Sequence, residues 1–162
     1  MIRALAIAGA AVAVFLVGAT QVPSQVRLPL STVVAGAVVS QPFGCTPLEL
    51  EPFDPSCPSH HTHTGIDLAA AQGTEVHAAT SGTAMTGFDA AGAGNFVDVI
   101  FDAHVRVVYC HLSAFAVRSG EAVVAGQVIG YVGATGLATG PHVHLQVDVD
   151  GVPVDPALFL AS

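Results

Sequence analysis

Two histidines stand two residues apart near the end of the chain, in a segment of strictly alternating polarity. Polar and apolar side chains alternate over residues 142–149, and His142 and His144 belong to the polar set. A period of two is typical of a half-buried β-strand, on which residues i and i+2 point to the same face. Both imidazoles can therefore reach one centre, and neutral imidazole is the commonest side-chain metal ligand. Alone, such a pair is more often part of an ordinary half-exposed strand, so other ligand-type residues must support it.

Further ligand-type residues occur near the middle of the chain. His63 and Asp67 are four positions apart, which fits one face of a helix, whereas Gly65 and the shortness of the segment fit a loop or strand edge equally well. Asp67 lies in an otherwise apolar run, where a buried carboxylate is costly unless it is paired or binds a metal. The alternative for Asp67 is a solvated turn residue. His60 and His61 are better explained as exposed loop residues.

Together these residues suggest a catalytic metal site. His63, Asp67 and one of His142 or His144 make a two-histidine, one-carboxylate set, which is the donor set of a catalytic zinc ion that keeps its fourth position for water. The other histidine of the pair and His111 remain available to deprotonate that water and to stabilise the oxyanion. The chain contains no His-Glu-x-x-His segment, which excludes the helical zinc-protease pattern.

The chain has three cysteines. Cys45 and Cys57 bracket a proline-rich loop, and in an exported protein they can close a disulfide that stabilises by about 3 kcal/mol on the chain-entropy model. We predict this bridge. Cys110 precedes His111, and a thiol beside a base can act as a nucleophile. Consecutive strand residues point to opposite faces, however, so we expect Cys110 to be a small buried residue.

Composition and turn signals predict one compact all-β domain. Short strands and turns alternate over residues 72–101, and a partner strand over 104–111 ends at His111. The glycine-rich loop 133–140 lacks the lysine of a phosphate-binding loop and is expected to form a cleft wall. Only 10% of the residues are charged and the net charge is −8, which argues against binding nucleic acid.

The N-terminal region is typical of an export signal. Arg3 precedes an apolar run over residues 4–18, and small residues allow cleavage after Ala19. We therefore expect a signal peptide or an uncleaved anchor over 1–19, an extended linker or pairing strand rather than a helix over 20–39, and a catalytic domain over 40–162. The predicted location is secreted, periplasmic or in the cell envelope, with membrane contact only if the leader is retained.

The chain resembles the M23, or lysostaphin-like, zinc metallopeptidases, which cut peptide cross-links in bacterial peptidoglycan. The similar motifs lie at residues 63–67, 78–82, 109–113, 126–130 and 135–144. The resemblance implies that His63, Asp67 and His144 hold Zn²⁺, while His111 and His142 act on the attacking water and the tetrahedral intermediate. It also implies a small antiparallel β-sheet domain of the duplicated hybrid-motif or barrel-sandwich type, with the metal on the floor of a narrow groove.

The chain departs from the family pattern at a few positions. Cys110 stands where Ala or Gly is more usual, and Leu145-Gln146 replaces the common Phe-Glu. No ligand is lost, so we expect an exported zinc metalloendopeptidase that hydrolyses peptidoglycan cross-links. One alternative is a non-catalytic member of the fold that binds cell wall or activates a partner hydrolase. Another is a structural zinc protein of an envelope or phage-tail assembly, in which His142 would fill the fourth ligand position.

Overall fold

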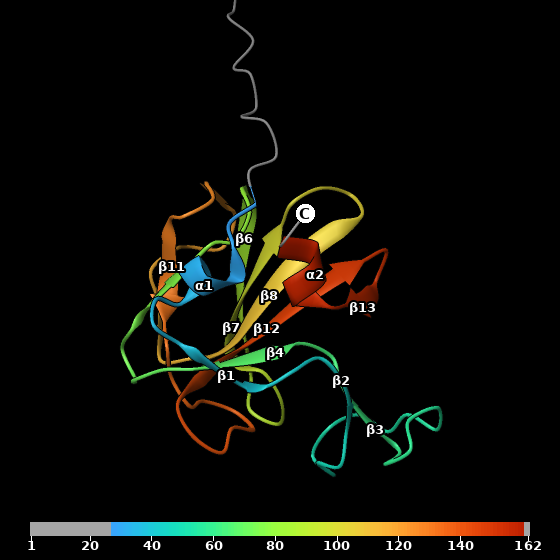
Figure 1. The fold of residues 1–162 in the computed structure, drawn as a ribbon. Helices are drawn as coiled ribbons and strands as arrows, with labels where there is room; N and C mark the ends of the chain where they lie inside the picture. The colour runs from blue at the N-terminus through green and yellow to red at the C-terminus, as the bar shows by residue number, and fades with distance from the viewer. Residues whose placement is uncertain (1–26, 161–162) are drawn as a thin grey trace, which may run out of the picture.

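The computed structural model describes residues 27–160, which form a fold built almost entirely of antiparallel β-strands (Figure 1). The elements are α1 (Leu30–Val33), β1 (Val38–Gln41), β2 (Gly44–Thr46), β3 (His61–His63), β4 (Ile66–Ala69), β5 (Glu75–His77), β6 (Gly82–Asp89), β7 (Gly94–Ile100), β8 (Val105–Leu112), β9 (Ala114–Phe115), β10 (Glu121–Val123), β11 (Val128–Tyr131), β12 (His142–Val149), β13 (Val152–Val154) and α2 (Pro156–Leu160). The prediction of an all-β antiparallel domain is confirmed.

The strands form one large sheet and two smaller ones. The large sheet has the order β1-β4-β12-β8-β7-β6-β10, and β13 also pairs with β12. The second sheet has the order β5-β11-β9, and β2 and β3 form a separate pair. The strand that carries the paired histidines, β12, thus lies inside the large sheet between β4 and β8, where both of its edges are hydrogen-bonded.

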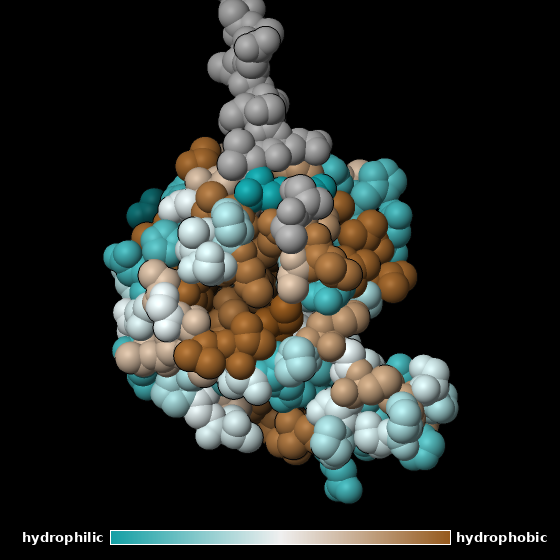
Figure 2. All heavy atoms as spheres, viewed as in Figure 1, coloured by the Kyte–Doolittle hydropathy of each residue, from teal (hydrophilic) through white to brown (hydrophobic). Residues whose placement is uncertain are grey.

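The core explains the alternation of β12. Val143, Leu145 and Val147 are completely buried, and they join side chains of the second sheet, such as Val76 and Ile129, in one hydrophobic cluster. Figure 2 shows hydrophobic side chains gathered in the middle of the viewed face, between α1 and α2. Because the apolar side of β12 is fixed in this core, its polar side must face the opposite surface of the sheet.

The structure of the segment before the large sheet differs from the prediction. An extended linker or pairing strand, rather than a helix, was expected over 20–39. Within the described part of this range, α1 forms a single helical turn, Val33 and Val34 are buried in the core, and the pairing strand β1 begins at Val38. The turn is closed by the Thr32 N–H and hydroxyl, which both donate to the Pro29 carbonyl. One turn is too short to give a helical period in the sequence.

The predicted leader, 1–19, lies outside the described residues, and within 27–160 no helix has the length and hydropathy needed to cross a membrane.

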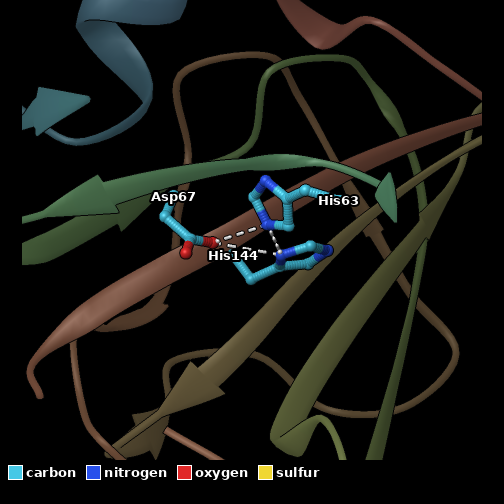
Figure 3. Close-up of side chains that lie close together, drawn as sticks. All are labelled: His63, Asp67 and His144. Carbon is cyan, nitrogen blue, oxygen red and sulfur yellow. Dashed lines mark hydrogen bonds and ion pairs between the residues drawn. The ribbon is translucent and has the colours of Figure 1, made fainter. Parts of the chain in front are cut away.

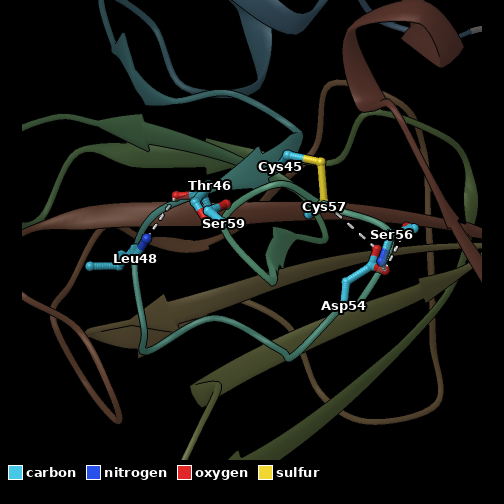
Figure 4. Close-up of a disulfide and its surroundings, with 7 residues drawn as sticks. All are labelled: Cys45, Thr46, Leu48, Asp54, Ser56, Cys57 and Ser59. Atoms are coloured by element: carbon cyan, nitrogen blue, oxygen red, sulfur yellow. Dashed lines mark hydrogen bonds between the residues drawn. A yellow bond between two sulfur atoms is a disulfide. The ribbon is translucent and has the colours of Figure 1, made fainter.

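The β2–β3 pair and its connecting loop form a lobe that protrudes from the main body at the lower right of Figure 1. In this lobe a disulfide joins Cys45 to Cys57 (Figure 4). The loop is further tied down by the Ser59 hydroxyl, which donates to the Thr46 carbonyl over 2.5 Å, and by Asp54, which accepts from the Ser56 hydroxyl over 2.6 Å. The lobe is therefore an ordered structure, and it is fixed next to β3.

Replacement of Leu145 by alanine tests whether the inward face of β12 holds the fold together. Leu145 is completely buried, and the cavity left by Leu145→Ala is expected to lower the free energy of unfolding by about 2–5 kcal/mol. Val152→Ala is the control, because Val152 is 61% exposed and such surface changes alter stability by about 0.5 kcal/mol or less. Urea unfolding in the presence of chelator measures both variants. Equal stabilities would contradict the assignment of the core.

Candidate metal centre

Three polar side chains from three strands converge on one point of the sheet surface. His63 comes from the end of β3, Asp67 from β4 and His144 from β12, and they point toward one another in Figure 3. His63 Nε2 lies 2.9 Å from His144 Nδ1, and Asp67 Oδ1 lies 3.1 Å from each of these nitrogens. The three ligand-type residues singled out in the sequence are thus brought together in the structure.

Sheet pairing and a tight connection produce this convergence. Strands β4 and β12 are antiparallel neighbours, and their register places Asp67 opposite His144. His63 reaches the same point because β3 ends at His63 and β4 begins at Ile66, so the chain turns at Thr64 and Gly65. The four-residue spacing of His63 and Asp67 therefore spans a turn between two strands, not a turn of helix.

Gly65 is required in this turn because His144 packs directly against it. A Cβ atom at position 65 would lie 2.7 Å from His144 Nε2 and would also collide with the Leu145 carbonyl oxygen. A side chain at this position must therefore displace either the ligand ring or the backbone of β12. The close approach explains why the small residue stands between the two ligand-bearing strands.

Hydrogen bonds on the outer side of each ring fix its tautomer. His63 Nδ1 lies 2.9 Å from the Pro42 carbonyl oxygen, and His144 Nε2 lies 3.5 Å from Gln146 Oε1. Both partners are oxygen acceptors, so we assign the ring protons to these outer nitrogens. The inner nitrogens then present lone pairs toward the Asp67 carboxylate.

Three lone-pair donors that face one another with no hydrogen between them suit a cation. The donor atoms of a four-coordinate metal with bonds of 2.0–2.1 Å are about 3.3 Å apart. The separations of 2.9–3.1 Å among His63, Asp67 and His144 are close to that spacing. Each of these three residues offers one ligand atom, and the three atoms lie close enough together to bind a single metal ion. The donor set therefore fits a divalent metal.

The electrostatics of the site also favour positive charge. Burial disfavours the charged form of both His63 and Asp67, but their mutual contact outweighs it. The pKa of His63 is raised, because burial lowers it but the adjacent Asp67 carboxylate, the Pro42 carbonyl and the charge of Glu51 together raise it more. The pKa of Asp67 lies well below its usual range, because the adjacent His144 and His63 rings favour the ionised carboxylate more than burial disfavours it. Asp67 is therefore an anion that attracts a cation.

Two further histidines, His111 and His142, flank the three donors. Their ring centroids are 4.7 Å apart, and His142 Nε2 lies 3.8 Å from Asp67 Oδ1. Each is held by a backbone carbonyl at 2.8 Å from Nδ1: His111 by Thr135 and His142 by Gly140. By the same reasoning their Nε2 atoms carry lone pairs. Burial, together with the neighbouring imidazoles, lowers the pKa of His111, so its neutral, proton-accepting form is favoured.

A β-bulge places His111 in the groove. Two residues of β8, Cys110 and His111, lie opposite the single residue Phe96 of β7, and His111 has a φ of 63°. Such bulges re-aim side chains next to functional sites, and here both residues line the groove. The bulge breaks the regular alternation on which the expectation of opposite faces rested, and the prediction that Cys110 is a buried residue is confirmed. Burial raises the pKa of the Cys110 thiol to about 12, which leaves it protonated and unsuited to nucleophilic catalysis.

The metal centre lies on the floor of an open groove with two walls. One wall is the disulfide-closed lobe, which contributes Leu48, Leu50 and Glu51. The other includes Leu137 and Thr139 of the glycine-rich loop, which was expected to form a cleft wall. Leu50 and Leu137 are each about half exposed. The walls thus offer aliphatic contacts above a polar floor.

Glu51 is a site residue that the sequence did not indicate. Its Oε1 atom lies 4.0 Å from His63 Nε2 and accepts a hydrogen bond of 3.3 Å from Gln41 Nε2. His61 also contacts Glu51: the Glu51 carbonyl oxygen lies 2.8 Å from His61 Nδ1. His61 therefore has a structural role in β3, whereas His60 is exposed as expected. Because Glu51 belongs to a loop with other acidic residues, only the folded lobe singles it out.

Comparison with known proteins identifies related chains. The model of peptidase family M23 matches residues 61–156. The DD-carboxypeptidase/endopeptidase Mpg of Neisseria meningitidis serogroup B is 41% identical over 118 residues, which are 73% of this chain and 26% of that protein. The chain thus spans about a quarter of the length of this relative.

Solved structures give the same result. The catalytic domain of the antimicrobial peptidase lysostaphin from Staphylococcus simulans superposes with a TM-score of 0.65 at 32% identity, covering 78% of this chain and 93% of that domain. A zinc-containing peptidase from Vibrio cholerae gives a TM-score of 0.67 at 29% identity, covering 81% of this chain and 38% of that one. The lysostaphin-like fold predicted from the sequence is therefore confirmed.

Substitution of Gly65 tests the packing between the turn and the ligand ring. Gly65→Ala is expected to displace His144 and to lower the affinity for a divalent metal at least tenfold, a loss within the range found for disturbed ligand orientation. Gly82→Ala is the matched control, because its Cβ would also collide with a backbone carbonyl, that of Ile100, but far from any ligand ring. Chelator competition on the folded variants measures the affinities. Equal losses in both would show that general strain, not ring displacement, is responsible.

Proposed function

Because the chain belongs to peptidase family M23, we propose that it is a zinc metalloendopeptidase that hydrolyses the peptide cross-links of bacterial peptidoglycan. The observation that carries the proposal is the convergence of the lone pairs of His63, Asp67 and His144 within 2.9–3.1 Å on the floor of a groove. Two nitrogens and one oxygen are the donor set of catalytic zinc sites. The zinc content of the Vibrio cholerae relative is consistent with this choice of metal.

In this proposal His63, Asp67 and His144 hold the zinc ion. When bound, zinc polarises a carbonyl and lowers the pKa of water to about 7. The protein orients two of the three donors from behind, His63 through the Pro42 carbonyl and His144 through the Gln146 amide. Such fixed donors need little reorganisation on binding.

His111 and His142 act on the attacking water and on the tetrahedral intermediate. Their Nδ1 protons are engaged by backbone carbonyls, which leaves Nε2 of each ring to exchange protons with the reacting groups. A neutral imidazole accepts a proton from water at Nε2, and the resulting imidazolium donates a hydrogen bond to the oxyanion or a proton to the leaving amine. The lowered pKa of His111 keeps it in the accepting form near neutral pH.

The groove suits an extended peptide. It is open to the surface, and aliphatic side chains such as Leu50 and Leu137 line its two walls. A cross-link in a polymer must enter from the side because its ends are not free, and an open groove permits this entry. The name of the Neisseria relative, a carboxypeptidase and endopeptidase, supports action on peptide bonds.

The proposed location is outside the cytoplasm, in the envelope or secreted. The Cys45–Cys57 disulfide supports this location, because such bonds persist in oxidising compartments. The proposed organisation is a leader over 1–19 and a catalytic domain that includes α1 and therefore begins before the residue 40 expected from the sequence. The alternatives remain a wall-binding or activating protein without catalysis and a structural zinc protein.

Single histidine variants separate metal binding from acid–base chemistry. His144→Ala is expected to abolish zinc binding and hydrolysis together, because it removes one of three donors. His111→Ala and His142→Ala are expected to retain zinc at one ion per chain while turnover falls by about 10² or more, the scale for general acid–base groups. Metal content and initial rates are measured on the same preparations. Retained zinc in His144→Ala would contradict the ligand assignment, and loss of zinc from His142→Ala would favour the structural-zinc alternative.

Digestion of purified peptidoglycan tests the function itself. Residues 20–162 are expected to release new amino groups, and not new reducing sugars, because peptide and not glycosidic bonds are cut. Chelator should abolish the release, and added zinc should restore it. The His144→Ala variant is the control for contaminating hydrolases. If zinc is bound but several wall types yield no amino groups, the peptidase proposal fails and the binding or activating role takes its place.

A further inference from the structure

Four imidazoles surround the metal centre, and one of them is held differently from the others. His63, His111 and His142 each place Nδ1 at 2.8–2.9 Å from a backbone carbonyl oxygen. His144 instead contacts a side chain, that of Gln146, through Nε2. Backbone carbonyls are fixed by the fold, but a flexible amide must itself be held in place. The orientation of this one ligand therefore depends on what anchors Gln146.

We propose that Gln146, anchored by the ion pair of buried Asp148 with Arg106, is a positioning residue that turns His144 Nδ1 toward the metal and sets the metal affinity. This inference rests on the proposed metal site. It concerns a residue that does not touch the metal, and it makes the ion pair a remote support of the centre.

The contacts of Gln146 determine which way its amide points. Gln146 Nε2 lies 2.8 Å from Asp148 Oδ1, and an ionised carboxylate only accepts hydrogen bonds. The amide nitrogen therefore faces Asp148, and Oε1 faces His144. The Thr64 hydroxyl donates to this same Oε1 over 2.7 Å, which is consistent with the assignment. Because Oε1 can only accept, His144 Nε2 must carry the proton, and Nδ1 is left free for the metal.

Asp148 is held by an ion pair with Arg106. Asp148 is buried, and a buried carboxylate is costly unless it is paired. Arg106 Nε and Nη2 lie 2.8 and 2.6 Å from Asp148 Oδ2, while Nη1 of the same guanidinium lies 3.1 Å from Asp98 Oδ2. One carboxylate oxygen of Asp148 thus binds Arg106 and the other binds Gln146. The chain of contacts runs from a fixed ion pair to the metal ligand.

This arrangement explains why an amide stands at position 146, where the resemblance to M23 enzymes leads one to expect Glu. A glutamate carboxylate in the place of the Gln146 amide would lie about 2.8 Å from Asp148 Oδ1 and would have no hydrogen to share. Gln146 instead donates to Asp148 and accepts from His144 and Thr64. The departure in sequence is therefore matched to the acidic residue two positions later.

Zinc affinity of purified residues 20–162 tests the proposal. Gln146→Leu removes the acceptor for His144 and is expected to weaken zinc binding by about 10–100-fold, the usual effect of losing an outer partner of a ligand. Gln127→Leu is the matched control. Like Gln146, Gln127 accepts a hydrogen bond through its amide oxygen, here from the Val124 N–H, and donates one to a carboxylate, here that of Glu121. Gln127 does not line the groove of the site. Its zinc affinity is expected to equal that of the parent chain.

A rescue experiment separates positioning from general stability. Gln146→Glu alone would place two carboxylates in contact. In Gln146→Glu combined with Asp148→Asn, the new amide at position 148 donates to the new carboxylate at position 146 while its carbonyl oxygen still accepts from Arg106, so a hydrogen-bonded anchor is kept without the ion pair. The double variant is expected to bind zinc with near-parental affinity and to recover the visible absorption of the Co²⁺-substituted protein, which Gln146→Leu should alter. Thermal unfolding of the metal-free proteins provides the reference for stability.

The outcomes distinguish this inference from the proposed function. If the folded parent chain binds no zinc, the proposed metal site fails. If the parent chain binds zinc but Gln146→Leu binds it equally well, or Gln127→Leu loses as much affinity, the positioning role of Gln146 is overturned while the metal site stands. Failure of the double variant to recover affinity would likewise overturn the role assigned to the hydrogen bond.

Discussion

The pairing of β4 with β12 is the interaction on which the proposed metal centre depends. Its register sets Asp67 opposite His144, and a slip of one residue would turn one of these side chains to the other face of the sheet. The register is secured from two sides: β8 pairs with the other edge of β12, and Leu145, which follows His144, is completely buried. The hydrophobic core and the metal site are thus two faces of the same strand.

Hydrogen bonds to the outer nitrogens of the imidazoles determine which nitrogen of each ring carries the proton. Sheet register brings the rings together, but it does not decide which nitrogen of each ring carries the proton. Backbone carbonyls decide this for His63, His111 and His142, and Gln146 does so for His144. As a result the orientation of each imidazole at the proposed centre is set by contacts that lie outside the groove.

Features with a local periodic signal could be predicted from the sequence, and features created by irregular backbone could not. The alternation over residues 142–149 predicted both the strand and the shared face of its histidines, because a period of two is characteristic of a strand with one buried face. The spacing of His63 and Asp67 left helix and turn open, since a separation of four fits both. The bulge at Cys110 and His111 leaves no trace in residue type, and Glu51 acquires its place only when its loop folds over the groove.

The disulfide lobe has a consequence for how such a domain can diversify. Cys45 and Cys57 close the loop at its base, and Cys45 belongs to β2, which pairs directly with the strand of His63. The loop also contacts the strand of His63 directly, because the Glu51 carbonyl oxygen lies 2.8 Å from His61 Nδ1 and the Pro52 carbonyl accepts from the Thr62 N–H. Residues that hold β3 in this way are therefore constrained, whereas exposed side chains of the loop that line the groove, such as Leu50, can vary without altering these contacts. In the proposed enzyme, substrate choice can diversify, or be redesigned, at such positions while the contacts that support His63 are kept.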